Sequence, residues 1–132
     1  MGTINASKVK AFVAAFVRAY WETVKSGKHS MPPNEPIEET VEELLAQVSH
    51  KVEIDTPSTG LKTSCTLHMS ARTGDWWEFR FQRTAVGWSL VDALASAGDD
   101  AKPHDLLDTV YGPYFKPFLQ HVTEVANTRT GM

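Results

Sequence analysis

The stretch TSCTLHMSARTGDWWEFRFQRTAVGWSLVD, residues 63–92, decides the fold. Apolar and polar side chains alternate along it with a period of two, which is typical of strands that bury one face. Two short segments that contain glycine, 73–75 and 85–87, interrupt the alternation and have the composition of hairpin turns. We therefore predict three consecutive antiparallel strands at 63–71, 76–82 and 88–92.

The alternation also gives each strand an inner and an outer face. The inner sets are apolar, and they comprise Cys65, Leu67 and Met69 on one strand and Trp77, Phe79 and Phe81 on the next. The outer sets comprise Ser64, Thr66, His68 and Ser70, then Trp76, Glu78, Arg80 and Gln82. A fourth strand is predicted from Lys51, where Val52 and Ile54 alternate with acidic residues before a turn at 56–60.

Helical periodicity flanks this meander on both sides. A first helix is expected between Ser7 as N-cap and Gly27 as stop, and a second from Asn34 as cap, with Pro36 in its first turn, to about residue 48. Residues 95–102 have the composition of a loop. After them a C-terminal helical segment is expected from about 106 to 126, capped near His104 and Asp105 and broken near Gly112, because Pro113 and Pro117 cannot both lie inside one straight helix.

Length and composition limit the class of protein. A chain of 132 residues fits a single domain, 1–132. Cys65 is the only cysteine, which excludes an intramolecular disulfide and favours a reducing compartment. No leader-like or membrane-spanning apolar run is present, and a net charge of −3 without a basic run argues against a nucleic-acid partner. We predict a cytoplasmic protein that binds neither membrane nor nucleic acid.

Catalytic and metal-binding signatures are missing from the sequence. The five histidines are far apart and form no metal-ligand spacing, and no nucleophile elbow or phosphate-binding loop occurs. Cys65 lies within an apolar strand face, which indicates a buried side chain rather than a nucleophile. His68 and Glu78 on neighbouring outer faces, with Asp92 beside them, could relay a proton, but a solvated cross-strand pair is the commoner arrangement. We therefore predict no catalytic residue, metal or cofactor.

Two surface features are candidate partner-binding sites. One is the acidic part of the second helix, with Glu38, Glu39, Glu42 and Glu43, which could attract a basic partner protein. The other is Trp76, a bulky aromatic residue on the polar face of its strand. The alternative for the helix is a solvated face whose acids complement the helix dipole.

The hairpin WWEFRFQRTAVGWSLV, residues 76–91, resembles the long hairpin of the nuclear transport factor 2-like superfamily. The first helix, with FVRAYW at residues 16–21, is similar to the opening helix of that superfamily. The resemblance implies a curved sheet wrapped by helices around a pocket, and relatives that include isomerase-like enzymes, scaffold proteins and bacterial immunity proteins. It implies a pocket-lining role for Tyr20. The catalytic acids of the enzymes have no counterpart here, and the forty residues after Asp92 depart from the pattern.

The sequence thus predicts an α+β domain with two N-terminal helices, a four-stranded antiparallel meander and a C-terminal helical segment packed on the sheet. The function that we expect is non-enzymatic binding of another protein, in its most concrete version as a bacterial immunity or adaptor protein that binds and neutralises a partner. The alternative is a small-molecule-binding or isomerase-like domain whose apolar pocket is lined by Tyr20, Trp77, Phe79 and Trp88.

Overall fold

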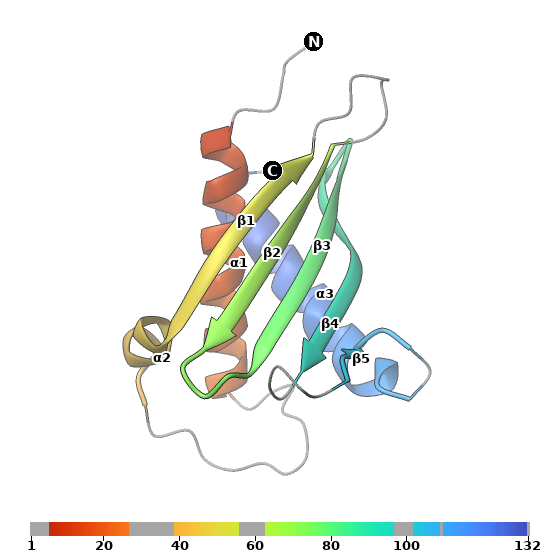
Figure 1. The fold of residues 1–132 in the computed structure, drawn as a ribbon. Helices are drawn as coiled ribbons and strands as arrows, with labels where there is room; N and C mark the ends of the chain where they lie inside the picture. The colour runs from red at the N-terminus through yellow and green to blue at the C-terminus, as the bar shows by residue number, and fades with distance from the viewer. Residues whose placement is uncertain (1–5, 27–38, 56–62, 97–101, 109, 132) are drawn as a thin grey trace.

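The computed structural model describes residues 6–26, 39–55, 63–96, 102–108 and 110–131 (Figure 1). Its elements follow in the order α1 (Ala6–Ser26), α2 (Val41–Gln47), β1 (Val48–Asp55), β2 (Ser64–Ala71), β3 (Trp76–Thr84), β4 (Gly87–Ser96), β5 (His104–Asp105) and α3 (Gly112–Arg129). The strands form one antiparallel sheet in the order β1-β2-β3-β4-β5, so neighbours in the chain are neighbours in the sheet. The predicted α+β class and meander are confirmed.

The two predicted hairpin turns set the register of the central strands. Gly74 has a φ of 95°, a left-handed conformation that glycine adopts without steric cost. The second turn places only two residues between the paired ends of β3 and β4, Thr84 and Gly87. This register buries Cys65 and Met69 on β2 and Phe79 on β3, so the predicted inner faces are confirmed.

Two helices cover the inner face of the sheet. In Figure 1, α1 and α3 lie side by side behind the strands. Phe16 of α1 packs against Phe81 with ring centroids 4.9 Å apart, and Tyr20 packs against Phe118 of α3 at 5.2 Å. The core is therefore a layer of aromatic rings between the helices and β3. At the surface, the Arg129 guanidinium donates hydrogen bonds of 2.6 and 3.0 Å to the carboxylate of Glu22, which ties α3 to α1.

Strand β4 is longer than predicted and contains a bulge. Leu90 lies opposite Phe81 and Asp92 opposite Arg80, so Val91 is an extra residue on β4. Because one extra residue reverses the alternation, even-numbered residues of β4 point inward before Val91 and odd-numbered residues point inward after it. Ala93 is therefore buried, whereas Val91 is exposed. The strand runs to Ser96, so the predicted loop at 95–102 begins too early; residues 97–101 lie outside the described part of the chain.

The structure corrects three boundaries near the helices. Helix α2 begins at Val41, where Thr40 and Glu43 form a capping box; the predicted cap Asn34 lies outside the described residues. The period-two pairing extends back to Val48, which ends α2 and begins β1. His104 and Asp105 form the short strand β5 beside β4, where a helix cap was expected.

The C-terminal segment contains one helix among the described residues. Residues 106–108, 110 and 111 form turns, where a helix was expected, and α3 starts at the predicted break, Gly112. Pro113 lies in the first turn of α3, where its missing N–H is not needed, and Pro117 lies inside the helix. The helix ends at Arg129, three residues later than predicted.

Candidate functional site

The outer face of the sheet is a polar surface formed by alternate residues of the strands. No described helix or strand packs on it, since α1 and α3 both lie on the inner face (Figure 1). None of the side chains described on this face of β1 to β3 is buried: Ser49, Lys51, Glu53, Ser64, Thr66, His68, Ser70, Trp76, Glu78, Arg80 and Gln82. An antiparallel sheet with one packed face and one solvated face has this alternation along each strand.

Trp76 and His68 form the aromatic part of this outer face. Their rings stack at a centroid distance of 5.6 Å with planes 25° apart. His68 lies directly opposite Glu78 across the β2–β3 ladder, as the alternation predicted. Both line a shallow hollow of about 250 Å³ with Lys51 and Glu53. Asp92 lies opposite Arg80 instead, so the structure does not bring it beside the pair.

The acids of α2 make contacts within the chain. Glu42 accepts a hydrogen bond of 2.7 Å from Arg18, and this bond holds the pKa of the Glu42 carboxyl below its usual range. Glu43 accepts from the backbone N–H of Thr40 in the capping box. The side chain of Glu39 is exposed. Glu38 lies outside the described residues. Part of the negative charge predicted as a docking surface is thus used to attach and cap a helix of seven residues.

The structure places α2 and Trp76 at the same end of the sheet. Ser49, two residues after α2, lies opposite Ser70, and Ser70 lies opposite Trp76 on the next strand. Two strand spacings, roughly 10 Å, therefore separate the end of α2 from this tryptophan. A hollow of about 340 Å³ lies where the end of α2 and the start of β1 meet the end of β2, and it is lined by Gln47, Ser49, Ser70 and neighbouring residues. We call Glu39, this hollow, His68 and Trp76 the α2–Trp76 surface.

The residues predicted to line an apolar pocket belong to the packed core. Phe79 is fully buried, and Tyr20 and Trp88 are nearly so. Phe16 packs against Phe79 at 5.2 Å, and Trp77 packs against Tyr20 at 6.5 Å. Desolvation raises the pKa of the Tyr20 hydroxyl well above its usual range. The rings that the sequence suggested for a ligand thus contact one another and the helices.

Burial also governs the chemistry of the single thiol. Cys65 is buried on the inner face of β2, and desolvation raises its pKa to about 12. A thiol with this pKa is protonated at neutral pH and is a poor nucleophile. Within the described residues, no three His, Cys, Asp or Glu side chains gather closely enough to hold a metal ion.

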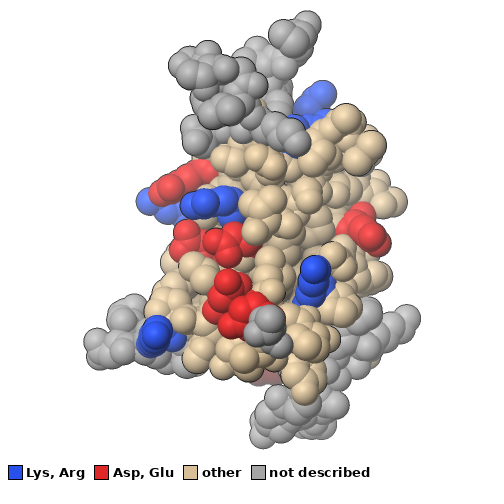
Figure 2. Space-filling view, turned by 90° about the vertical axis from the view of Figure 1, so that its right-hand side faces the viewer, with Lys and Arg blue, Asp and Glu red and all other residues tan. Residues whose placement is uncertain are grey.

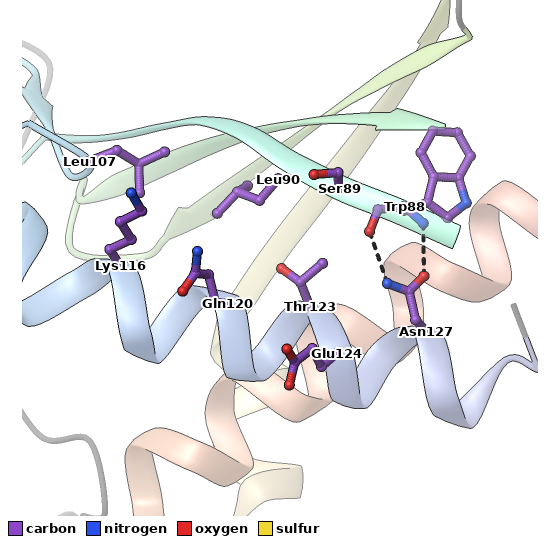
Figure 3. Close-up of a pocket in the computed structure, with 9 residues that line it drawn as sticks. All are labelled: Trp88, Ser89, Leu90, Leu107, Lys116, Gln120, Thr123, Glu124 and Asn127. Carbon is purple, nitrogen blue, oxygen red and sulfur yellow. Dashed lines mark hydrogen bonds between the residues drawn. The ribbon is translucent and has the colours of Figure 1, made fainter. Parts of the chain in front are cut away.

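A third hollow, which the sequence did not indicate, lies between β4 and α3 (Figure 3). Its volume is about 330 Å³. At one end, Asn127 of α3 accepts a hydrogen bond from Trp88 N–H and donates one to Trp88 C=O, both 2.9 Å long. The polar residues of α3 that line it are Lys116, Gln120, Thr123, Glu124 and Asn127. Their spacing of three, four and seven residues is a polar stripe that the sequence contains, but only the fold shows what it faces.

The edge of the sheet that carries this hollow is shown in space-filling form in Figure 2. Acidic and basic side chains occur there in small separate groups on a mostly uncharged surface. None of the described helices is long and apolar enough to cross a membrane. No family model matches the chain, and no curated protein or solved structure is significantly similar to it.

Proposed function

We propose that this protein is a non-enzymatic binding domain whose target is another protein and whose docking site is the α2–Trp76 surface. One observation carries the proposal: the inner face of the sheet is filled by buried aromatic side chains, whereas Trp76 lies on the outer face, half-buried and stacked on His68. Partly exposed tryptophan residues are enriched among the side chains that dominate protein interfaces.

The partner that fits this surface carries an apolar anchor and basic groups. The hollow beside Ser49 and Ser70 has room for one side chain of a partner. The stacked rings of Trp76 and His68, on the neighbouring part of the outer face, offer an aromatic contact beside it. The exposed carboxylate of Glu39 and the chain's net charge of −3 favour a basic partner and salt-dependent association.

The most concrete version of the proposal is a cytoplasmic immunity or adaptor protein of bacterial type. The resemblance of the 76–91 hairpin to the nuclear transport factor 2-like superfamily supports it, because that superfamily includes immunity proteins. A single cysteine, buried on β2, is consistent with a reducing compartment. The isomerase-like alternative has less support, because the aromatic rings that would line its pocket pack against one another.

The test is affinity capture from native lysate at low and high salt, with three single variants beside the wild type. Trp76→Ala removes the anchor and Glu39→Lys reverses the exposed charge. Gln82→Ala is the matched control, since Gln82 lies on the same face of β3 at its other end. Circular dichroism confirms that each variant is folded.

The expected result is a salt-sensitive partner captured by the wild type and by Gln82→Ala, and lost or strongly reduced with Trp76→Ala and Glu39→Lys. A set of captured proteins that is the same for all four forms would show that the α2–Trp76 surface is not the docking site, and the proposal would fail.

A further inference from the structure

Some backbone N–H and C=O groups of β4 point away from β3, and their hydrogen-bond partners differ along the strand. In an antiparallel pair, every second residue turns its N–H and C=O away from the neighbouring strand. Trp88, opposite Arg83, is such a residue, because its N–H and C=O bond to Asn127 instead of β3. Leu90, two residues further along, must turn the same two groups to the same side.

Beyond the bulge, the outward groups again find partners. The N–H of Ala93 donates to the Asp92 carboxylate at 3.0 Å, and its C=O accepts from the backbone N–H of Leu106 at 2.9 Å. Strand β5 then covers the edge opposite Leu94 and Ala95. Between Asn127 and β5, the alternation directs the N–H and C=O of Leu90 away from β3, and no turn, cap or side chain of the described residues bonds to them.

This pair lies at the hollow between β4 and α3, which Leu90 helps to line. Figure 3 shows the side chains of Gln120 and Thr123 pointing from α3 toward β4, while Lys116 reaches toward Leu107. The Glu124 carboxylate also lines the hollow but lies farther from β4 than these groups. A volume of about 330 Å³ is within the range of small-ligand sites.

We propose that this hollow binds a small molecule that carries an amide with donor and acceptor on the same side, together with a carboxylate. The amide pairs with the N–H and C=O of Leu90, as the carboxamide of Asn127 pairs with those of Trp88. The carboxylate is held by Lys116, which forms no ion pair within the described residues. Gln120 closes the site from α3. This site is separate from the α2–Trp76 surface and does not depend on the proposed function.

Both open-chain carboxamides and cyclic amides have a donor and an acceptor on the same side. One probe of each kind therefore shows which of the two the hollow binds. Succinamate carries an open-chain carboxamide and orotate a cyclic amide, each with a carboxylate. Two matched compounds each remove one group: monomethyl succinate replaces the amide by an ester without a donor, and succinamide has no carboxylate. Each compound is titrated into the isotope-labelled full chain, and the backbone amide signals are followed by nuclear magnetic resonance.

The expected result is a saturable downfield shift of the Leu90 amide proton with succinamate, orotate or both. Monomethyl succinate binds roughly tenfold more weakly, because it leaves the Leu90 C=O without a donor. Succinamide and the variant Lys116→Met weaken binding about two- to fivefold, as expected for an exposed ion pair. Gln120→Phe, a substitution at an exposed position that fills the hollow, abolishes the shift, whereas Thr128→Phe outside the hollow leaves it unchanged.

Three outcomes would overturn the inference. The first is an unchanged Leu90 signal with both probes up to their solubility limits. The second is equal affinity for monomethyl succinate and succinamate, which would show that the N–H and C=O of Leu90 do not both bond to the ligand. The third is binding that survives Gln120→Phe in a variant whose spectrum shows the native fold, which would place the ligand elsewhere.

Discussion

Removing the carboxamide of Asn127 tests how α3 is attached to the edge of the sheet. In the structure this side chain replaces a neighbouring strand, because it satisfies both outward groups of Trp88 at 2.9 Å. The variant Asn127→Ala keeps a good helix former in α3 and removes only these two bonds. Any loss of stability therefore reports the bonds rather than the helix.

The magnitude follows from the two bonds and their partial burial. A neutral hydrogen bond contributes about 0.5–1.5 kcal/mol net, so Asn127→Ala should lower the free energy of unfolding by about 1–3 kcal/mol. Because both bonds are only part-buried, water can reach the freed groups, and we expect a value in the lower half of this range.

Gly87 supplies a second variant that is coupled to the first. It has a φ of 142°, and a Cβ added there would lie 2.7 Å from Oδ1 and 3.0 Å from Cγ of Asn127. Gly87→Ala therefore costs backbone strain, about 1–3 kcal/mol, and a clash with a side chain that two hydrogen bonds hold in place. In the Asn127→Ala background the clash is gone and only the strain remains.

The assay is guanidinium denaturation followed by tryptophan fluorescence for the wild type, both single variants and the double variant. We expect the double variant to lose about 1 kcal/mol less than the sum of the single losses. Thr128→Ala, an exposed neighbour on α3, is the control and should change stability by less than about 0.5 kcal/mol. Losses that add within about 0.5 kcal/mol would refute the contact between Asn127 and β4.

Two further predictions concern the core and the link between α1 and α3. Phe79→Ala should cost about 3–5 kcal/mol in the same denaturation assay, because the ring is fully buried; a loss below about 1 kcal/mol would contradict the assigned inner face of β3. The hydrogen bond from Arg129 lowers the pKa of Glu22, so this carboxylate stabilises the fold above its unfolded pKa of about 4.3, and the contribution is lost as pH falls through the lower folded pKa. The variant Glu22→Gln should therefore be less stable than the wild type at neutral pH, by up to about 1 kcal/mol for this partly exposed pair. The difference in stability should disappear in acid. A difference that does not change with pH would contradict a stabilising ion pair between Arg129 and Glu22.

Local patterns predicted the central sheet correctly because the causes are local. A period of two must place Cys65 and Leu67 on one face of a strand and His68 on the other, whatever the strand pairs with. Gly74 in a short polar segment favours a tight turn for the same reason, since the left-handed conformation depends on one residue. The cross-strand pair of His68 and Glu78 then follows from the register that the turn imposes.

The errors occur where a neighbour in space overrides the local pattern. Val91 looks like an ordinary member of an alternating strand, and only the pairing with β3 makes it the extra residue of a bulge. His104 and Asp105 have the composition of a helix cap, but they lie beside Leu94 and Ala95 and complete a ladder. Two residues are too few to carry a strand period of their own.

For the candidate sites, too, the sequence identified single features and the tertiary structure decided how they are arranged. The sequence alone identified Trp76 and the acids of α2 as separate features, and it identified the aromatic residues that fill the core. Only the tertiary structure placed α2 at the same end of the sheet as Trp76 and showed how the core rings pack against one another and against the helices. The hollow at Leu90 was not visible in the sequence at all.

The physical reason is the range over which each property is decided. The faces of strands and the stripes of helices depend on residues two to four apart, so the sequence of this protein determined them by itself. A hollow depends on two elements that leave backbone groups uncovered where they meet, and here β4 and α3 meet at residues almost forty positions apart, Trp88 and Asn127. Only the packed chain decides which groups at such a meeting point stay free to bind something else.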